Sequence, residues 1–163
     1  MSKRRDQRPR GRGSKQFLML TMDLIRHSNY RALSPRAVKL LIDVGSFYSG
    51  FNNGDLAVTS KVMKGCGWSS NDQLRKALDE LLYYEFLIKT RQGGRNHCSL
   101  YAIAWEPIDH CKGKHDVAET NKGSDAWKKP KEKYHRKDVQ GRGAVFGKSE
   151  RRTVAPIPVK NEI

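Results

Sequence analysis

The feature that most constrains the fold is a change of apolar periodicity between residues 71 and 105. Over residues 71–84 apolar side chains recur every three or four positions, as on one face of an α-helix. The series is Leu74, Ala77, Leu78, Leu81 and Leu82. From residue 86 the period falls to about two, which predicts strands over FLIKTR (86–91) and HCSLYAIAW (97–105). The glycine-rich QGGRN (92–96) is expected to be the turn of this β-hairpin.

The helix over residues 71–84 is expected to be amphipathic. Its polar face carries Asp72, Gln73, Arg75, Lys76 and Asp79. The spacing offers two ion pairs one helical turn apart, Arg75 with Asp79 and Lys76 with Glu80. Its N-cap is expected to be Ser69, Ser70 or Asn71.

Capping residues predict further helices earlier in the chain. Thr21 is expected to cap a helix from Met22 to about His27. Ser34 and Pro35 are typical of an N-cap and a first-turn proline, and they begin a helix that Gly50 ends. A broad apolar stripe indicates that this second helix is buried. The stripe consists of Val38, Leu40, Leu41, Ile42, Val44, Gly45, Phe47 and Tyr48.

Residues 51–68 predict a turn, a short strand and a short helix. FNNG (51–54) has the composition of a turn, and residues 55–58 are expected to form the strand. The short helix over 61–64 has Thr59 or Ser60 as its cap and Gly65 and Gly67 at its end. Trp68 is expected to cover this short helix rather than to stack on a nucleic-acid base.

Charge divides the 163-residue chain into three parts. The net charge is +15, with 32 Lys and Arg against 17 Asp and Glu. Residues 1–15 contribute +6, residues 16–109 only +2, and residues 110–163 contribute +7. We therefore expect a basic disordered arm (1–15), a folded domain (16–109) and a basic, mostly irregular tail (110–163). Within the tail, Trp127 and Tyr134 are candidates for local anchors.

Several function classes are disfavoured by the sequence. No apolar run approaches the roughly 20 residues of a membrane span, and three cysteines indicate a reducing, intracellular setting. The candidate metal ligands lack metal-binding spacing, and neither Cys66 nor Ser69 has a convincing base for nucleophilic catalysis. We therefore expect no enzyme activity, no cofactor and no metal. The candidate ligands considered were His97, Cys98, His110, Cys111 and His115.

The expected element order is helix, strand, short helix, turn, longer helix and basic hairpin, which is the order of a winged helix-turn-helix domain. Residues 17–109 resemble small winged helix-turn-helix DNA-binding proteins of phages and integrative mobile elements. They are also similar to the DNA-binding regions of phage replication proteins. The resemblance rests on LSPRAVKLLIDV, FNNGDLAVTS, GWSSNDQLRKALDELLYYEFLIKTR and SLYAIAWEPID. It implies an α+β fold with a β-hairpin wing and duplex DNA as the partner.

The resemblance also implies which residues contact DNA. The N-terminal side of the longer helix would enter the major groove and the hairpin would lie on phosphates or in the minor groove. The helix contacts would be Ser69, Ser70, Asn71, Gln73, Arg75 and Lys76, and the wing contacts would be Lys89, Arg91, Arg95 and Asn96. Asp72, Asp79 and Glu80 depart from a uniformly basic recognition face.

The N-terminal arm is a further candidate contact. Its arginines alternate with small or polar residues, a composition that suits phosphates, a narrow minor groove or RNA. They are Arg4, Arg5, Arg8, Arg10 and Arg12.

Three functions remain open at this point. The first is a DNA-binding transcriptional regulator or replication accessory of a phage or mobile element, in the bacterial cytoplasm with the nucleoid, acting alone or as a homodimer. The second is a protein-binding adaptor or inhibitor of host machinery built on a winged helix, since a fold does not fix a function. The third is an RNA-binding protein that uses its Arg/Gly arm.

Overall fold

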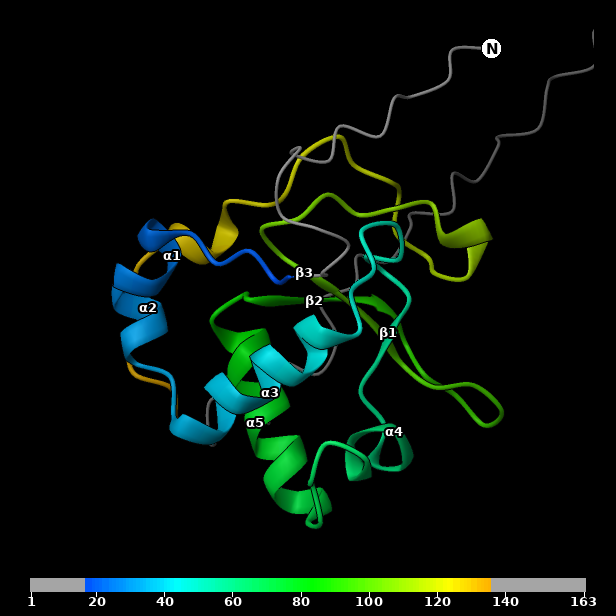
Figure 1. Ribbon diagram of the computed structural model, residues 1–163, viewed down its shortest axis with the longest axis horizontal. Helices are drawn as coiled ribbons and strands as arrows, with labels where there is room; N and C mark the ends of the chain where they lie inside the picture. The colour runs from blue at the N-terminus through cyan, green and yellow to red at the C-terminus, as the bar shows by residue number, and fades with distance from the viewer. Residues whose placement is uncertain (1–16, 136–163) are drawn as a thin grey trace, which may run out of the picture.

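The computed structural model describes residues 17–135 and has an α+β architecture, as the sequence predicted (Figure 1). Within this range the helices are α1 (Met22–Arg26), α2 (Ser28–Arg31), α3 (Pro35–Ser46), α4 (Ser60–Lys64) and α5 (Asn71–Tyr83). The strands are β1 (Leu56–Ala57), β2 (Leu87–Arg91) and β3 (Leu100–Ile103). Two 3₁₀ turns follow, η1 (Cys111–Gly113) and η2 (Ala126–Lys128). No helix in the described range is long and apolar enough to cross a membrane.

The strands form an antiparallel sheet in the order β1-β3-β2. Leu56 of β1 pairs with Tyr101, and Leu87 of β2 pairs with Ile103. The second arm of the hairpin is shorter than residues 97–105, because only β3 pairs along its length and Gly94 and His97 form an isolated bridge near the tip. A β-bulge between Lys89 and Arg91 interrupts the pairing of β2 with β3.

Side-chain caps fix the starts of the helices where the sequence predicted them. Ser34 Oγ accepts a hydrogen bond from the Ala37 amide at the start of α3. Of the alternatives left open, Thr59 caps α4 and Ser70 caps α5. Thr21 caps α1 as expected, whereas α2, which begins one residue after His27, was not predicted. Each cap satisfies amide groups that the first helical turn leaves without intrahelical partners.

Helix α3 differs from its prediction in length and in its buried face. It ends at Ser46 rather than near Gly50, because the Phe47 amide closes the last turn on Val44 and the chain then enters a loop. Ile42 and Phe47 were expected in the buried stripe, but their side chains are 41% and 40% exposed. The face packed into the core consists of Ala37, Leu40, Leu41, Val44 and Gly45.

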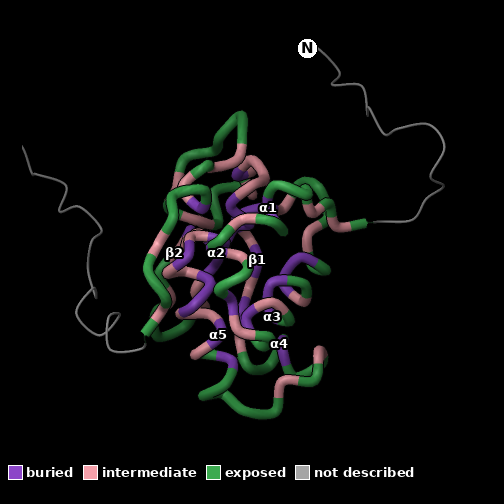
Figure 2. The backbone as a smooth tube through the Cα atoms, turned by 90° about the vertical axis from the view of Figure 1, so that its left-hand side faces the viewer, coloured by how far each residue is buried: buried purple, intermediate pink, exposed green. Residues whose placement is uncertain are grey.

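The core lies where α3, α5 and the sheet meet, and buried positions gather there in Figure 2. From α5 it receives Leu74, Ala77 and Leu81, while Leu78 and Leu82 are partly buried at its edge. Tyr84 and Phe86 follow α5 and are fully buried. Burial of this apolar surface is the main stabilising contribution to a domain of this size.

The segment after residue 109 packs against the domain rather than leaving it. It is mostly irregular, as expected, but Trp127 is 3% exposed and belongs to the core. The Asn29 side chain donates to the carbonyls of Trp127 and Lys129 and accepts from the Lys131 amide. Packing of the described chain therefore continues to about residue 134, where the Tyr134 amide donates to Tyr84 Oη. The basic arm (1–15) and residues 136–163 lie outside the described range.

Candidate nucleic-acid interface

The turn between α4 and α5 is fixed to α3 by a small polar cluster. Trp68 Nε1 donates to Asp43 Oδ2 over 2.7 Å, and the Trp68 amide donates to the Met63 carbonyl of α4. Lys39 Nζ pairs with the same Asp43 oxygen at 2.5 Å and donates to the Cys66 carbonyl at 2.8 Å. Trp68 packs against the core, in agreement with its expected structural role. The turn therefore presents α5 at a fixed angle to α3.

Glu80 orients α5 from its inner side. Its carboxylate is 4% exposed and accepts hydrogen bonds from the Ser34 amide (2.5 Å) and from Ser34 Oγ (2.6 Å). The expected surface pair of Lys76 with Glu80 is therefore absent, and Lys76 pairs instead with Asp72 at 2.5 Å. The expectation was wrong because Glu80 lies on the helix face that meets the start of α3. As a result, Glu80 adds no negative charge to the exposed face of α5.

The exposed N-terminal end of α5 carries most of the predicted helix residues. Ser69, Ser70, Asn71, Gln73 and Arg75 are exposed, and Lys76 is half-buried. Three of these side chains already have partners: Ser70 Oγ caps the helix, Gln73 Oε1 accepts from Arg36 at 2.9 Å, and Lys76 pairs with Asp72.

The four predicted wing residues differ in what their side chains do. Arg91 donates from Nε and Nη2 to the Cys98 carbonyl and from Nη1 to the Lys114 carbonyl. Lys89 Nζ donates to Gln92 Oε1 within the hairpin. Arg95 and Asn96 are exposed at the tip. Arg91 therefore shapes the hairpin, and the tip residues remain open to a ligand.

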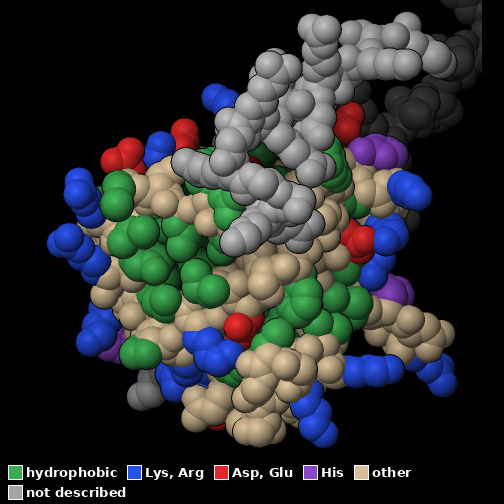
Figure 3. Space-filling model, in the orientation of Figure 1, with side chains coloured by type: hydrophobic (Ala, Val, Ile, Leu, Met, Phe, Trp, Pro, Cys, Tyr) green, Lys and Arg blue, Asp and Glu red, His purple; other side chains and the backbone are tan. Residues whose placement is uncertain are grey.

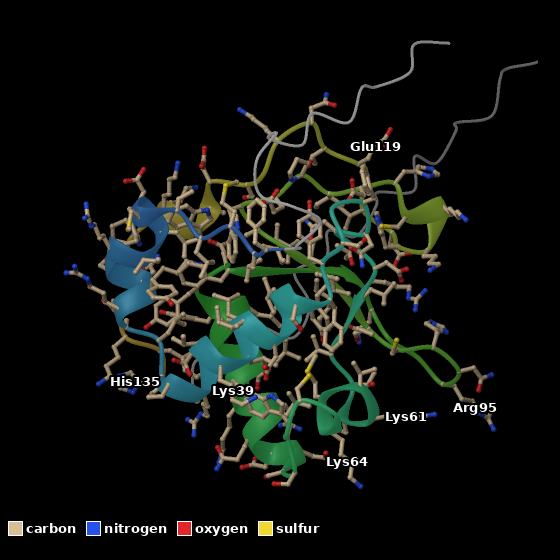
Figure 4. The ribbon with its side chains drawn as sticks, viewed as in Figure 1. Lys39, Lys61, Lys64, Arg95, Glu119 and His135 are labelled. Carbon is tan, nitrogen blue, oxygen red and sulfur yellow. The ribbon has the colours of Figure 1, made fainter. Side chains whose placement is uncertain are left out.

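Two lysines that sequence reasoning missed complete this surface. Lys61 and Lys64 are exposed on α4, and Figure 4 shows them between the start of α5 and the hairpin tip with Arg95. Figure 3 shows Lys and Arg side chains projecting along this edge. In the described part of the chain, Lys61, Lys64, Arg75 and Arg95 form no ion pair. The signal in the sequence was their spacing of three on a short capped helix, which places both on one side.

These residues together make a positively charged edge, which we call the α4–α5–hairpin edge and define as Lys61, Lys64, Ser69–Lys76, Arg95 and Asn96. The arginines of the predicted arm, Arg4, Arg5, Arg8, Arg10 and Arg12, lie outside the described residues. Comparison of the chain with protein-family models, curated proteins and solved structures finds no match.

Proposed function

We propose that this chain is a winged helix-turn-helix protein that binds duplex DNA. The support for the fold is the element order α3-β1-α4-α5-β2-β3 combined with the sheet order β1-β3-β2, which leaves the β2–β3 hairpin free to project as a wing. The resemblance to phage and mobile-element proteins supports a role in transcription or replication in a bacterial cytoplasm.

The observation that carries the proposal is the α4–α5–hairpin edge. Cations without ion pairs among the described residues gather on one side with the exposed start of a helix. Amide and guanidinium groups such as those of Asn71 and Arg75 suit base edges in the major groove. Lys61, Lys64 and Arg95 suit phosphates, which position a protein on DNA without reading its sequence.

The test is selection of bound duplexes from a random library, followed by affinity titrations between about 50 and 200 mM salt. We expect a consensus sequence and an affinity that falls steeply with salt, because each neutralised phosphate releases counterions. Arg75→Ala should relax preference at one base position, at about 1–3 kcal/mol. Arg95→Ala should weaken all duplexes alike and lower the salt slope by about 1.

Lys129→Ala supplies the control, since Lys129 is an exposed lysine without an ion pair among the described residues. Its carbonyl accepts from Asn29 of α2, and α2 lies across the molecule from α4 in Figure 1. The affinity of Lys129→Ala for duplex DNA should equal that of the unaltered protein. Absence of duplex binding at micromolar protein would contradict the proposal. Tighter binding of structured RNA would favour the RNA-binding alternative, and a palindromic consensus would indicate a homodimer.

A further inference from the structure

A cavity of about 520 Å³ lies between the 51–55 turn and residues 109–119. Its walls include Phe51, Asp55, Asp109, His110, Lys112 and Glu119. None of these residues belongs to the α4–α5–hairpin edge. In Figure 4, Glu119 lies at the top of the molecule, far from the hairpin tip with Arg95. The volume is within the range of small-molecule sites, roughly 300–1,000 Å³.

The backbone that carries the aromatic ring at this cavity is fixed by hydrogen bonds of the two residues that follow it. Phe51 is 76% exposed, the highest value among the large exposed apolar side chains of the described chain. The next residue, Asn52, accepts from the Ser49 amide and donates to the Phe47 carbonyl. Asn53 is fully buried, and its amide group donates to the carbonyls of Ile103, Glu106 and Pro107. A ring on a fixed backbone loses little conformational entropy when a flat ligand stacks on it.

The opposite wall is tied to the base of the hairpin. Arg91 bridges the Cys98 and Lys114 carbonyls, so the wall and the hairpin hold a common position. Cys111 and Lys112 have left-handed backbone conformations, with φ of 45° and 56°. Such conformations persist in non-glycine residues where the surrounding structure imposes them, and they gather at ligand sites. Burial raises the pKa of the Cys111 thiol, so the thiol stays neutral and donates to the Asn53 carbonyl.

The cavity is lined by charged side chains of both signs, and only some of them already have partners within the protein. Asp55 is paired with Lys114, and the Asp109 carboxylate accepts from the backbone amide of Asn53. Lys112 and Glu119 are exposed and form no ion pair among the described residues. A ligand with a flat ring, hydrogen-bond donors and a negative group would satisfy the ring, the carboxylate and the ammonium together.

We propose that this cavity binds an unpaired nucleotide, with its base stacked on Phe51, its amino group donating to Glu119 and its phosphate against Lys112. Stacking on aromatic side chains beside cations is the general means of binding single-stranded nucleic acid. Carboxylates accept from the exocyclic amino group of cytosine, which thymine lacks. The site therefore prefers cytosine over thymine. This nucleotide site is separate from the proposed duplex interface, and the inference does not depend on duplex binding.

The experiment is an amide-resolved NMR titration of the full chain with d(CCC), d(TTT) and the free nucleotide dCMP. We expect d(CCC) to shift resonances of residues 51–55 and 109–119 and to bind more tightly than d(TTT). Binding of dCMP at the same resonances would indicate a free nucleotide as the ligand, and binding of d(CCC) alone would indicate a base within a strand. Either result supports the site, whereas shifts confined to the α4–α5–hairpin edge overturn it.

Variants separate stacking from general loss of structure. Phe51→Ala and Phe51→Leu should weaken d(CCC) binding by about 5- to 150-fold, the range for loss of one stacked base. Phe47→Ala is the matched control, because Phe47 is exposed nearby but does not line the cavity. Glu119→Ala should remove the preference for d(CCC) over d(TTT).

Unchanged d(CCC) binding by both Phe51 variants, or equal loss in Phe47→Ala, would overturn the proposal. The NMR spectrum of each variant reports its folding, and Phe51→Leu keeps an apolar side chain where Phe51→Ala does not. Duplex affinity measured on the same samples should be unaffected by the Phe51 variants. If d(CCC) binds as expected while duplex DNA does not bind, the proposed function fails and this site remains.

Discussion

Among single residues, Glu106 and Tyr48 form a titrating pair at the edge of the domain. Burial, together with the nearby charges of Glu106 and Asp109 and a hydrogen bond to Glu106, raises the pKa of Tyr48 to about 12. Burial also raises the pKa of Glu106, while the hydrogen bond from Tyr48 lowers it. For both groups the folded protein favours the protonated form. Ionised Glu106 therefore opposes folding.

The sign of this effect predicts a pH dependence. Because the pKa of Glu106 is higher in the folded state, its favourable contribution is complete below its ordinary pKa of 4.5 and is lost as the pH rises through the folded value. Glu106→Gln keeps an acceptor for Tyr48 Oη and removes the half-buried charge. We expect the variant to melt at a higher temperature than the unaltered protein at pH 7, with the difference shrinking towards pH 4. Melting curves by circular dichroism across this range measure it, and a difference independent of pH would contradict it.

Between elements, the angle of α5 on α3 depends on Glu80. Glu80→Ala leaves the half-buried Ser34 amide and hydroxyl without their acceptor. We expect a loss of about 1–3 kcal/mol in the free energy of unfolding, measured by urea denaturation. Glu80→Gln keeps one acceptor oxygen and should lose less.

Asp116→Ala provides the comparison for Glu80→Ala, since Asp116 is exposed and its side chain makes no ion pair within the described range. Its unfolding free energy should stay within about 0.5 kcal/mol of the unaltered protein. If Glu80→Ala is as stable as Asp116→Ala, the carboxylate does not hold α5 on α3.

The elements that could be predicted from the sequence are those set by local chemistry. Thr21, Ser34 and Pro35 begin helices where capping rules require, and α5 ends within one residue of its expected end. Features that depend on distant residues could not be predicted. Glu80 has a surface-like place in the helical pattern, and only the start of α3 beside it explains its burial.

In the candidate site too, some features follow from the local sequence and others depend on distant residues. The exposure of the N-terminal end of α5 follows from its apolar spacing, whereas the contact of its residues with DNA stays a prediction. Arg91 donates to the Lys114 carbonyl, 23 positions away, and this structural role could not be predicted from the hairpin sequence. Lys61 and Lys64 could not be placed on this edge from the sequence, because their position beside the hairpin depends on where α4 lies in the fold.

In the whole molecule, the charge is concentrated outside the described domain. Residues 17–135 contain eighteen Lys and Arg and thirteen Asp and Glu, so they supply only a third of the net charge of +15. A domain close to neutral needs a local arrangement of cations to attract a polyanion, and the α4–α5–hairpin edge is such an arrangement. Long-range attraction would come from the basic ends of the sequence.

The folded unit extends past residue 109, because Trp127 packs into the core. Trp127 stacks on Phe86 with ring centroids 6.1 Å apart and meets the His27 ring edge-on at 5.5 Å. The Asn29 side chain donates to the carbonyls of Trp127 itself and of Lys129. Residues 124–134 thus close over α1 and α2 (Figure 1), and Trp127, a candidate local anchor of the irregular tail, is part of the core.

We therefore expect Trp127→Ala to lower the free energy of unfolding by about 3–5 kcal/mol, as for other buried aromatic residues. Trp127→Phe should cost less, because it keeps a ring against Phe86 and because Trp127 Nε1 has no hydrogen-bond partner among the described residues. Urea unfolding followed by circular dichroism measures both variants. If Trp127→Ala unfolds within about 1 kcal/mol of the unaltered protein, the segment after residue 109 adds little to the fold, and the boundary expected from charge alone is the correct one.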